Sequence, residues 1–255
     1  GIESVISNFL RDEKLSKNSI SLFNSKRYKI INNSRYDIVH LHWINGETIS
    51  IEDIGKIKKP ILWTLQDMWP FSGSEHYTYK SFWKKKNSLK KKNFFSNFNI
   101  SNYIFERKKK AWTNKIYIVG TSKWITKSAK ESLLMKKNPT ITISNTLDTK
   151  FWKPISKKKS KQFFRIPEKT RVIGFSSLGK DNHFLKGKDL FSSAINKLKP
   201  TNQKLAVLSI GDSNNLIGIN DNIEKFKFPR FENNNNLKKF YNALDLIVVP
   251  SRMEA

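Results

Sequence analysis

Two polar residues, Gln66 and Asp67, stand where the apolar run 60–65 stops. A glutamine side chain both donates and accepts hydrogen bonds, whereas an ionised aspartate only accepts them. His42, at the end of an earlier apolar run, can carry a proton near neutral pH. Gln66 and His42 are therefore candidates for contacting a polar substrate. We expect Asp67 instead to shape its loop by accepting backbone N–H groups.

The run 36–43 contains a second histidine, His40. We expect His40 and His42 to face opposite sides of a strand, and His40 to be the one that packs or caps. The alternative for either is an ordinary histidine with its hydrogen bonds satisfied in the core or at a sheet edge.

The elements that would position these residues are short runs rich in β-branched and aromatic side chains. Near-continuous apolar runs favour strands covered on both faces, as in parallel sheets. Helical spacing of apolar residues predicts helices over 122–137, 187–199 and 236–244. Strands alternating with helices predict an α/β fold. The predicted strands are 36–43, 60–65, 115–122, 140–144, 171–177, 204–211 and 245–251.

Two segments interrupt the alternation. Residues 80–103 are rich in Lys, Asn, Ser and Phe without a clear period, which predicts a long loop or insertion. Residues 148–170 hold prolines and a basic run, which predicts a linker between two α/β domains. The expected domains are therefore 1–153 and 154–255.

Composition limits the classes of function. A chain of 255 residues with 38% hydrophobic residues can bury a sizeable core, and the absence of cysteine excludes thiolate chemistry and disulfides. The net charge of +27 favours polyanionic partners, which are nucleic acid, anionic lipid or phosphate-bearing substrates. Runs of lysine such as 84–86, 90–92, 108–110 and 157–159 are interpreted as solvated faces or loops.

A series of motifs follows along the chain. They are YDIVHLHWING, KKPILWTLQDMWPFSGSEHY, ERKKKAWTNKIYIVGTSKWI, ISNTLDTKFWKP, FLKGKDLFSSAINKL, LAVLSIGD and LKKFYNALDLIVVPSRMEA. In these motifs and their order, the chain resembles family 4 glycosyltransferases of bacterial polysaccharide assembly, of the colanic-acid type. The resemblance implies a GT-B fold, in which two Rossmann-like domains with parallel sheets face a cleft.

The resemblance also implies an activity. A hexose would pass, with retention, from a UDP- or GDP-sugar bound by the C-terminal domain to a hydroxyl of a polysaccharide or lipid-linked oligosaccharide bound by the N-terminal domain. Neither a metal nor any other cofactor is expected, because the nucleotide-sugar is a co-substrate. Expected partners are this donor, the saccharide acceptor and an anionic membrane surface. The expected location is the cytoplasm or the inner face of the plasma membrane.

Site residues follow from the matching positions. On the acceptor side, the resemblance implies catalytic roles for His42 and Gln66 and acceptor contacts for Asp67, His76 and Tyr77. Most relatives have histidine where this chain has Gln66, which keeps hydrogen-bonding reach but does not titrate.

On the donor side, the resemblance implies that Lys186 contacts the diphosphate and that Glu254 accepts bonds from sugar hydroxyls. Ser177 and Gly179, at and after the end of the run 171–177, complete this side. Leu185 stands where relatives carry an arginine, so Lys180 or His183 would have to replace it.

The first strand and Gly-rich loop of the family, and its motifs beyond Glu254, are expected to be missing, so the chain is interpreted as truncated at both ends. One alternative function is an inactive GT-B remnant that keeps weak nucleotide-sugar binding. A nucleic-acid-binding module is a third hypothesis, motivated by the charge and by aromatic residues among lysines in 81–98. No recognised nucleic-acid motif accompanies them.

Overall fold

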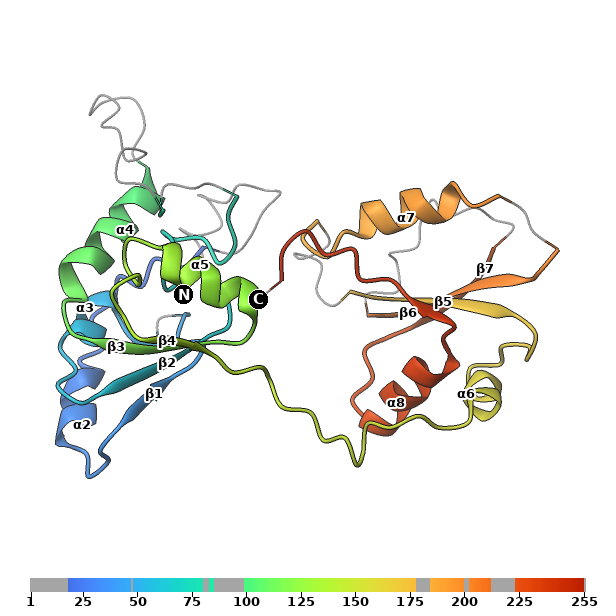
Figure 1. Cartoon of the computed structure of the whole chain (residues 1–255), viewed down its shortest axis with the longest axis horizontal. Helices are drawn as coiled ribbons and strands as arrows, with labels where there is room; N and C mark the ends of the chain where they lie inside the picture. The colour runs from blue at the N-terminus through green and yellow to red at the C-terminus, as the bar shows by residue number, and fades with distance from the viewer. Residues whose placement is uncertain are drawn as a thin grey trace. The chain divides into compact units, whose positions relative to one another are not determined.

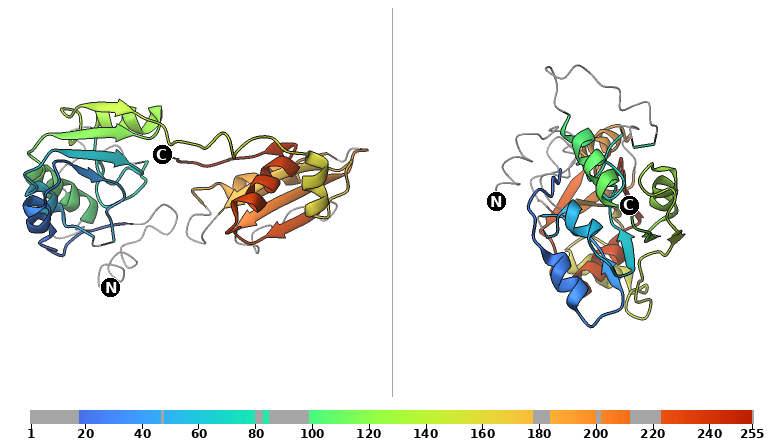
Figure 2. Two further views of the ribbon diagram at one scale, coloured as in Figure 1. Left: turned by 90° about the horizontal axis from the view of Figure 1, so that it is seen from below. Right: turned by 90° about the vertical axis from the view of Figure 1, so that its left-hand side faces the viewer.

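The computed structural model describes residues 18–46, 48–79, 83–84, 99–177, 184–199, 202–211 and 223–254. The chain divides into two compact units (Figures 1 and 2). The first comprises 1–145 with 254–255, and the second comprises 146–253. No helix in the described part of the chain is long and apolar enough to cross a membrane.

The first unit is built on a parallel sheet in the order β1-β2-β3-β4. Its strands are β1 (Val39–Leu41), β2 (Ile61–Leu65), β3 (Ile116–Gly120) and β4 (Thr140–Thr142). Leu41 pairs with Trp63, and Leu65 pairs with Gly120. Because parallel strands end at the same edge, the residues that follow β1 and β2 come together there.

Helices of the first unit follow from local capping and apolar spacing. The helices are α2 (Arg27–Asn33), α3 (Ile51–Gly55), α4 (Ile100–Ala111) and α5 (Lys123–Glu131). Ser50 and Ser122 cap α3 and α5 by accepting backbone N–H groups through their hydroxyls. Helix α5 buries Ile125 and Ala129 against β3 and β4, while α3 and α4 pack on each other.

The second unit contains another parallel sheet, in the order β7-β6-β5-β8. Its strands are β5 (Arg171–Ser177), β6 (Leu205–Gly211), β7 (Glu224–Phe228) and β8 (Leu246–Ile247), and its helices are α6 (Lys157–Phe163), α7 (Lys188–Asn196) and α8 (Asn234–Ala243). Helix α7 lies on one face of this sheet, and α6 and α8 lie on the other (Figure 1). On the α7 face, Phe191 stacks on Phe175 with 4.5 Å between ring centroids.

The expected fold class, α/β with parallel sheets in two Rossmann-like units, is confirmed. The terminal strands are shorter than predicted: β1 has only three residues and β8 two. Strand β7, where lysines alternate with aromatic residues, was not predicted. Helix α4 begins at Ile100, inside the segment expected to be a loop; residues 80–82 and 85–98 of that segment lie outside the described ranges.

The segment 148–170 is more than a linker. Helix α6 lies within it and buries Ser160 and Lys161, and Phe164 at its end enters the core beside Phe240 of α8. The division of the chain falls at 145/146 rather than at 153/154.

Candidate functional site

The candidate site of the first unit lies at the carboxyl edge of its sheet. A small pocket there is lined by residues that follow β1 and β2, among them His42, Trp43, Gln66 and Asp67. Both histidine and amide side chains in it can bond a hydroxyl group. The pairing of β1 with β2 thus brings His42 and Gln66 to one place, although the sequence separates them.

Asp67 is buried, and its carboxylate accepts three hydrogen bonds. Oδ1 accepts the backbone N–H of Trp69 at 3.0 Å, as expected for a loop-shaping aspartate. Oδ2 lies 2.5 Å from Nδ1 of His76 and accepts the indole N–H of Trp43 at 3.1 Å. Asp67 therefore joins the loop after β2 to the residue that follows β1 and to a distant histidine.

His76 continues this chain of bonds. Because an ionised carboxylate cannot donate, Nδ1 carries the proton shared with Asp67, and in the neutral ring Nε2 then accepts from the Ser19 hydroxyl at 2.9 Å. Ser19, His76 and Asp67 are each only 6% exposed. Such a Ser–His–Asp order suits nucleophilic catalysis, but a hydroxyl sealed from solvent cannot reach a substrate. The three side chains hold the loops together instead.

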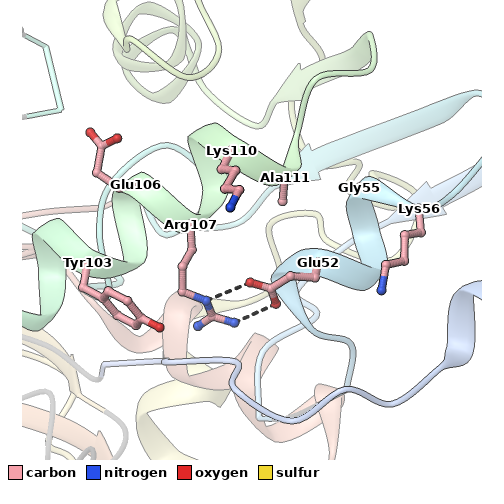
Figure 3. Close-up of a pocket in the computed structure, with 8 residues that line it drawn as sticks. All are labelled: Glu52, Gly55, Lys56, Tyr103, Glu106, Arg107, Lys110 and Ala111. Carbon is pink, nitrogen blue, oxygen red and sulfur yellow. Dashed lines mark hydrogen bonds and ion pairs between the residues drawn. The ribbon is translucent and has the colours of Figure 1, made fainter.

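The segment that carries Ser19 is itself anchored. The indole of Trp69 donates to the Ser19 carbonyl at 2.8 Å, and Arg107 of α4 donates to the carbonyls of Ile20 and Ser21 at 2.9 Å each. Arg107 also forms two bonds with the carboxylate of Glu52, at 2.8 and 2.7 Å (Figure 3). This ion pair lies in an open groove between α3 and α4, which Lys56 and Lys110 also line.

Lys108, one position further along α4, holds the loop that follows Asp67. Its side chain is fully buried, and its ammonium donates to the carbonyls of Trp69 at 2.5 Å and Gly73 at 2.6 Å. The same Nζ lies 3.7 Å from the centre of the Trp69 ring, a cation–π contact. Burial holds the pKa of Lys108 well below its ordinary value. The interpretation of run 108–110 as wholly solvated is therefore wrong for Lys108.

The expectation that His40 and His42 face opposite sides is also wrong. Their ring centroids lie 4.2 Å apart, because residues two apart in a strand share a face. Nε2 of His40 lies 2.8 Å from the hydroxyl oxygen of Thr64 on β2. Partial burial and the neighbouring His42 lower the pKa of His40.

Gln66 and Tyr77 are both half-buried. The Tyr77 hydroxyl lies 3.5 Å from the Gln66 carbonyl, a long contact. All the residues expected on the acceptor side are thus neighbours in the structure: His42, Gln66, Asp67, His76 and Tyr77. Their roles toward a substrate remain predictions.

Two of the expected donor-side residues lie at the end of β5 and just before α7 of the second unit. Ser177 ends this strand and is 4% exposed, and its hydroxyl has no partner in the described structure. Lys186, half-buried, lies in the turn that leads into α7. Gly187 caps that helix with φ +67°, and a Cβ there would lie 2.0 Å from the Pro250 carbonyl oxygen. Only glycine fits this close approach.

Leu185 is buried, so the position where the resemblance implies an arginine is apolar here. Arg252 reaches the same turn from the other side: it donates to the Phe184 carbonyl at 2.7 Å and forms two bonds with Asp189, at 2.7 and 2.6 Å. Glu254 is exposed and falls outside the second unit. Gly179, Lys180 and His183 lie outside the described residues.

Sequence reasoning missed several residues that build the first site: Trp43, Ser19, Arg107 and Lys108. Trp43 could have been noticed, since it directly follows His42 at the end of an apolar run. Ser19, Arg107 and Lys108 reach the site through contacts between distant parts of the chain, which no local sequence pattern predicts. Within the described ranges, no three His, Asp or Glu side chains lie close enough together to hold a metal ion.

Comparisons with known proteins bear on the fold. No protein-family model and no curated protein matches the chain. The chain is similar to the crystal structure of a glycosyltransferase from Rickettsia africae ESF-5, with a TM-score of 0.52 and 18% identity over 88% of this chain and 54% of that one. It is also similar to sucrose-phosphate synthase from Thermosynechococcus elongatus, with a TM-score of 0.54 and 13% identity over 89% of this chain and 53% of that one. The chain spans about half the length of these structures, and its fold is the two-unit parallel α/β fold that they share.

Proposed function

We propose that the protein is a retaining glycosyltransferase of family 4. It transfers a hexose from a UDP- or GDP-sugar to a hydroxyl of a polysaccharide or lipid-linked oligosaccharide, in the cytoplasm or at the inner face of the plasma membrane. The observation that carries the proposal is the placement of polar side chains at the carboxyl ends of both parallel sheets. Ligands of open α/β sheets bind at such ends.

In the second unit, the donor diphosphate fits beside the start of α7. Helix N-termini present unpaired N–H groups and a positive dipole end to phosphate. Lys186 precedes this helix, and the hydroxyl of Ser177 is buried without a partner at the end of β5. Lys186 would neutralise the charge that develops on the leaving diphosphate. Glu254, which falls outside this unit, is the proposed acceptor of hydrogen bonds from sugar hydroxyls.

In the first unit, His42 and Gln66 would contact the reacting sugars, and Asp67 and His76 would hold them in place. A glutamine bonds hydroxyls but cannot shuttle a proton, so we assign it a positioning role and leave proton transfer to His42. Tyr77 would complete the acceptor side.

Binding of UDP-glucose, GDP-mannose and related donors, measured by calorimetry on the full chain, tests this proposal. Lys186→Gln should weaken donor binding by roughly tenfold to a hundredfold, as expected for a lost charge-assisted contact of about 1.5–3 kcal/mol. Lys197→Gln is the matched control, because Lys197 is exposed at the other end of the same helix. Donor binding that Lys186→Gln leaves unchanged would contradict the assignment.

Two observations favour a second candidate, an inactive remnant that only binds nucleotide-sugar. Gln66 stands where the resemblance implies a titratable histidine, and buried Leu185 stands where it implies an arginine. Incubation of the full chain with a labelled donor and lipid-linked saccharides separates the two: donor binding without any transfer favours the remnant.

A further inference from the structure

Trp43 is exposed where apolar packing would bury it. Trp43 is the second residue after β1, and its side chain is 54% exposed, whereas Trp63 and Trp69 of the same unit are 1% and 0% exposed. Tryptophan offers the largest apolar surface of any side chain, and its burial is strongly favourable. An exposed tryptophan at a sheet's carboxyl edge therefore suggests a surface kept for a ligand.

The exposed ring is held in one orientation. The indole N–H donates to Asp67 Oδ2 at 3.1 Å, and the ring centroid lies 5.8 Å from that of His76. Asp67 and His76 are buried and bonded to each other. A ligand that stacks on Trp43 thus meets a ring whose rotamer is already fixed, so little conformational entropy is lost on binding.

The surroundings indicate the chemistry of the ligand. Trp43 shares a pocket with His42 and Gln66, which offer hydrogen-bond donors and acceptors next to the indole. Among the described residues, no lysine or arginine lines this pocket, although the chain carries a net charge of +27. A site for a phosphate-bearing ligand would be expected to contain lysine or arginine side chains. A flat apolar surface with hydrogen-bonding groups at its rim instead complements a sugar ring, which has a face of C–H groups and an edge of hydroxyls.

We propose that Trp43 is the stacking platform for the acceptor saccharide, with His42 and Gln66 bonding its hydroxyls. This inference rests on the proposed function and adds to it the residue that selects a pyranose ring as acceptor. Asp67 acts in it as a positioning residue, because it fixes the indole rather than touching the sugar.

Titration of the full chain with methyl glycosides of glucose, galactose and mannose, and with N-acetylglucosamine, tests the proposal. The readout is the indole N–H signal of Trp43 in a ¹H–¹⁵N spectrum, assigned by its loss in Trp43→Phe. At least one of these saccharides should shift that signal saturably. Glycerol, which has hydroxyls without an apolar ring face, should not.

Substitutions of Trp43 then test whether saccharide binding depends on stacking or is weakened by loss of any exposed tryptophan. Trp43→Ala should weaken binding of the same saccharide at least tenfold, or about 1.4 kcal/mol. Trp43→Phe keeps an aromatic face but loses the bond to Asp67, so it should weaken binding less. Trp124→Ala is the matched control: Trp124 on α5 is 42% exposed and lies outside this pocket. Saturation-transfer NMR on the sugar protons measures binding for every variant.

Several outcomes would overturn the inference. These are the absence of a shift with every saccharide, equal losses for Trp43→Ala and Trp124→Ala, and a larger response to uridine monophosphate than to any saccharide. Donor binding by the second unit, measured on the same sample, keeps this failure distinct from that of the proposed function. If the donor binds but no saccharide reaches Trp43, only the platform is wrong. If a saccharide binds Trp43 while no donor binds, the platform stands and the transferase proposal fails.

Discussion

Asp67→Asn tests whether the carboxylate that joins the two loops is what holds the candidate site together. The substitution keeps the shape of the side chain. Its amide oxygen can still accept the Trp69 N–H, as Oδ1 does at 3.0 Å. The new NH₂ group, however, takes the place of Oδ2, which in the unchanged protein accepts hydrogen bonds from both His76 and Trp43.

The two donors respond differently to this change. His76 can move its proton to Nε2 and accept from the new amide, so a charge-assisted bond becomes a neutral one. The indole N–H of Trp43 has no such freedom and loses its acceptor. A charged bond contributes about 1.5–3 kcal/mol and a neutral bond about 1 kcal/mol, so the first unit should lose roughly 2–3 kcal/mol of unfolding free energy.

Urea unfolding of the full chain, followed by tryptophan fluorescence, measures this loss, because Trp63, Trp69 and Trp112 report on the first unit. The Trp43 indole signal should move in the same variant. Asp37→Asn is the control, since Asp37 is exposed and no hydrogen bond or ion pair to its side chain is seen among the described residues. A loss below about 1 kcal/mol with an unmoved Trp43 signal would refute the reasoning.

Two further predictions concern stability. Lys108→Met leaves the buried carbonyls of Trp69 and Gly73 without a donor, so the first unit should lose roughly 2–4 kcal/mol of unfolding free energy. Lys109→Met changes an exposed position and should cost little. Urea unfolding of both variants tests this, and equal losses would contradict the role of Lys108. For Asp245, burial alone would raise the pKa, but the bonds from the Val172 N–H, Lys157 and Lys161 lower it to about 2 from 3.8. Because the folded pKa is lowered, the stabilisation is present above the unfolded value and disappears as the pH falls from about 4 to 2. It is at most about 2 kcal/mol, and less because the side chain of Lys157 is half exposed to solvent. Asp245→Asn should flatten the acid limb of an unfolding curve for the second unit, and an unchanged limb would exclude this contribution.

The sheets of both units could be predicted because their strands are apolar runs that end in polar residues. The run 60–65 became β2 and the run 171–177 became β5 with almost no change of bounds. The edge strands were predicted too long. Tyr36 and Ile38 fit a strand by composition, yet they remain exposed beside β1, because pairing with a neighbour rather than propensity sets a strand's length.

Much of the candidate site could not be predicted, for a physical reason. Ser19 bonds His76 across 57 residues, and Arg107 bonds the Ile20 carbonyl across 87 residues. Such contacts depend on how the chain folds back on itself and leave no periodic trace in the sequence. Lys108 shows the same limit: its neighbours Lys109 and Lys110 are exposed, and only the rotation of α4 turns Lys108 inward.

The buried polar chain explains how an exposed candidate site can be rigid without a covalent crosslink. Arg107 and Trp69 fix the segment that carries Ser19, Ser19 bonds His76, and His76 bonds Asp67. The polar groups of each member have hydrogen-bond partners, and under this condition a buried polar group stabilises the fold rather than destabilising it. At the far end of this series Asp67 bonds Trp43, whose side chain is 54% exposed. The loop after β2 thus does not need to order itself around a ligand, and its polar residues are available for recognition beside a fixed aromatic ring.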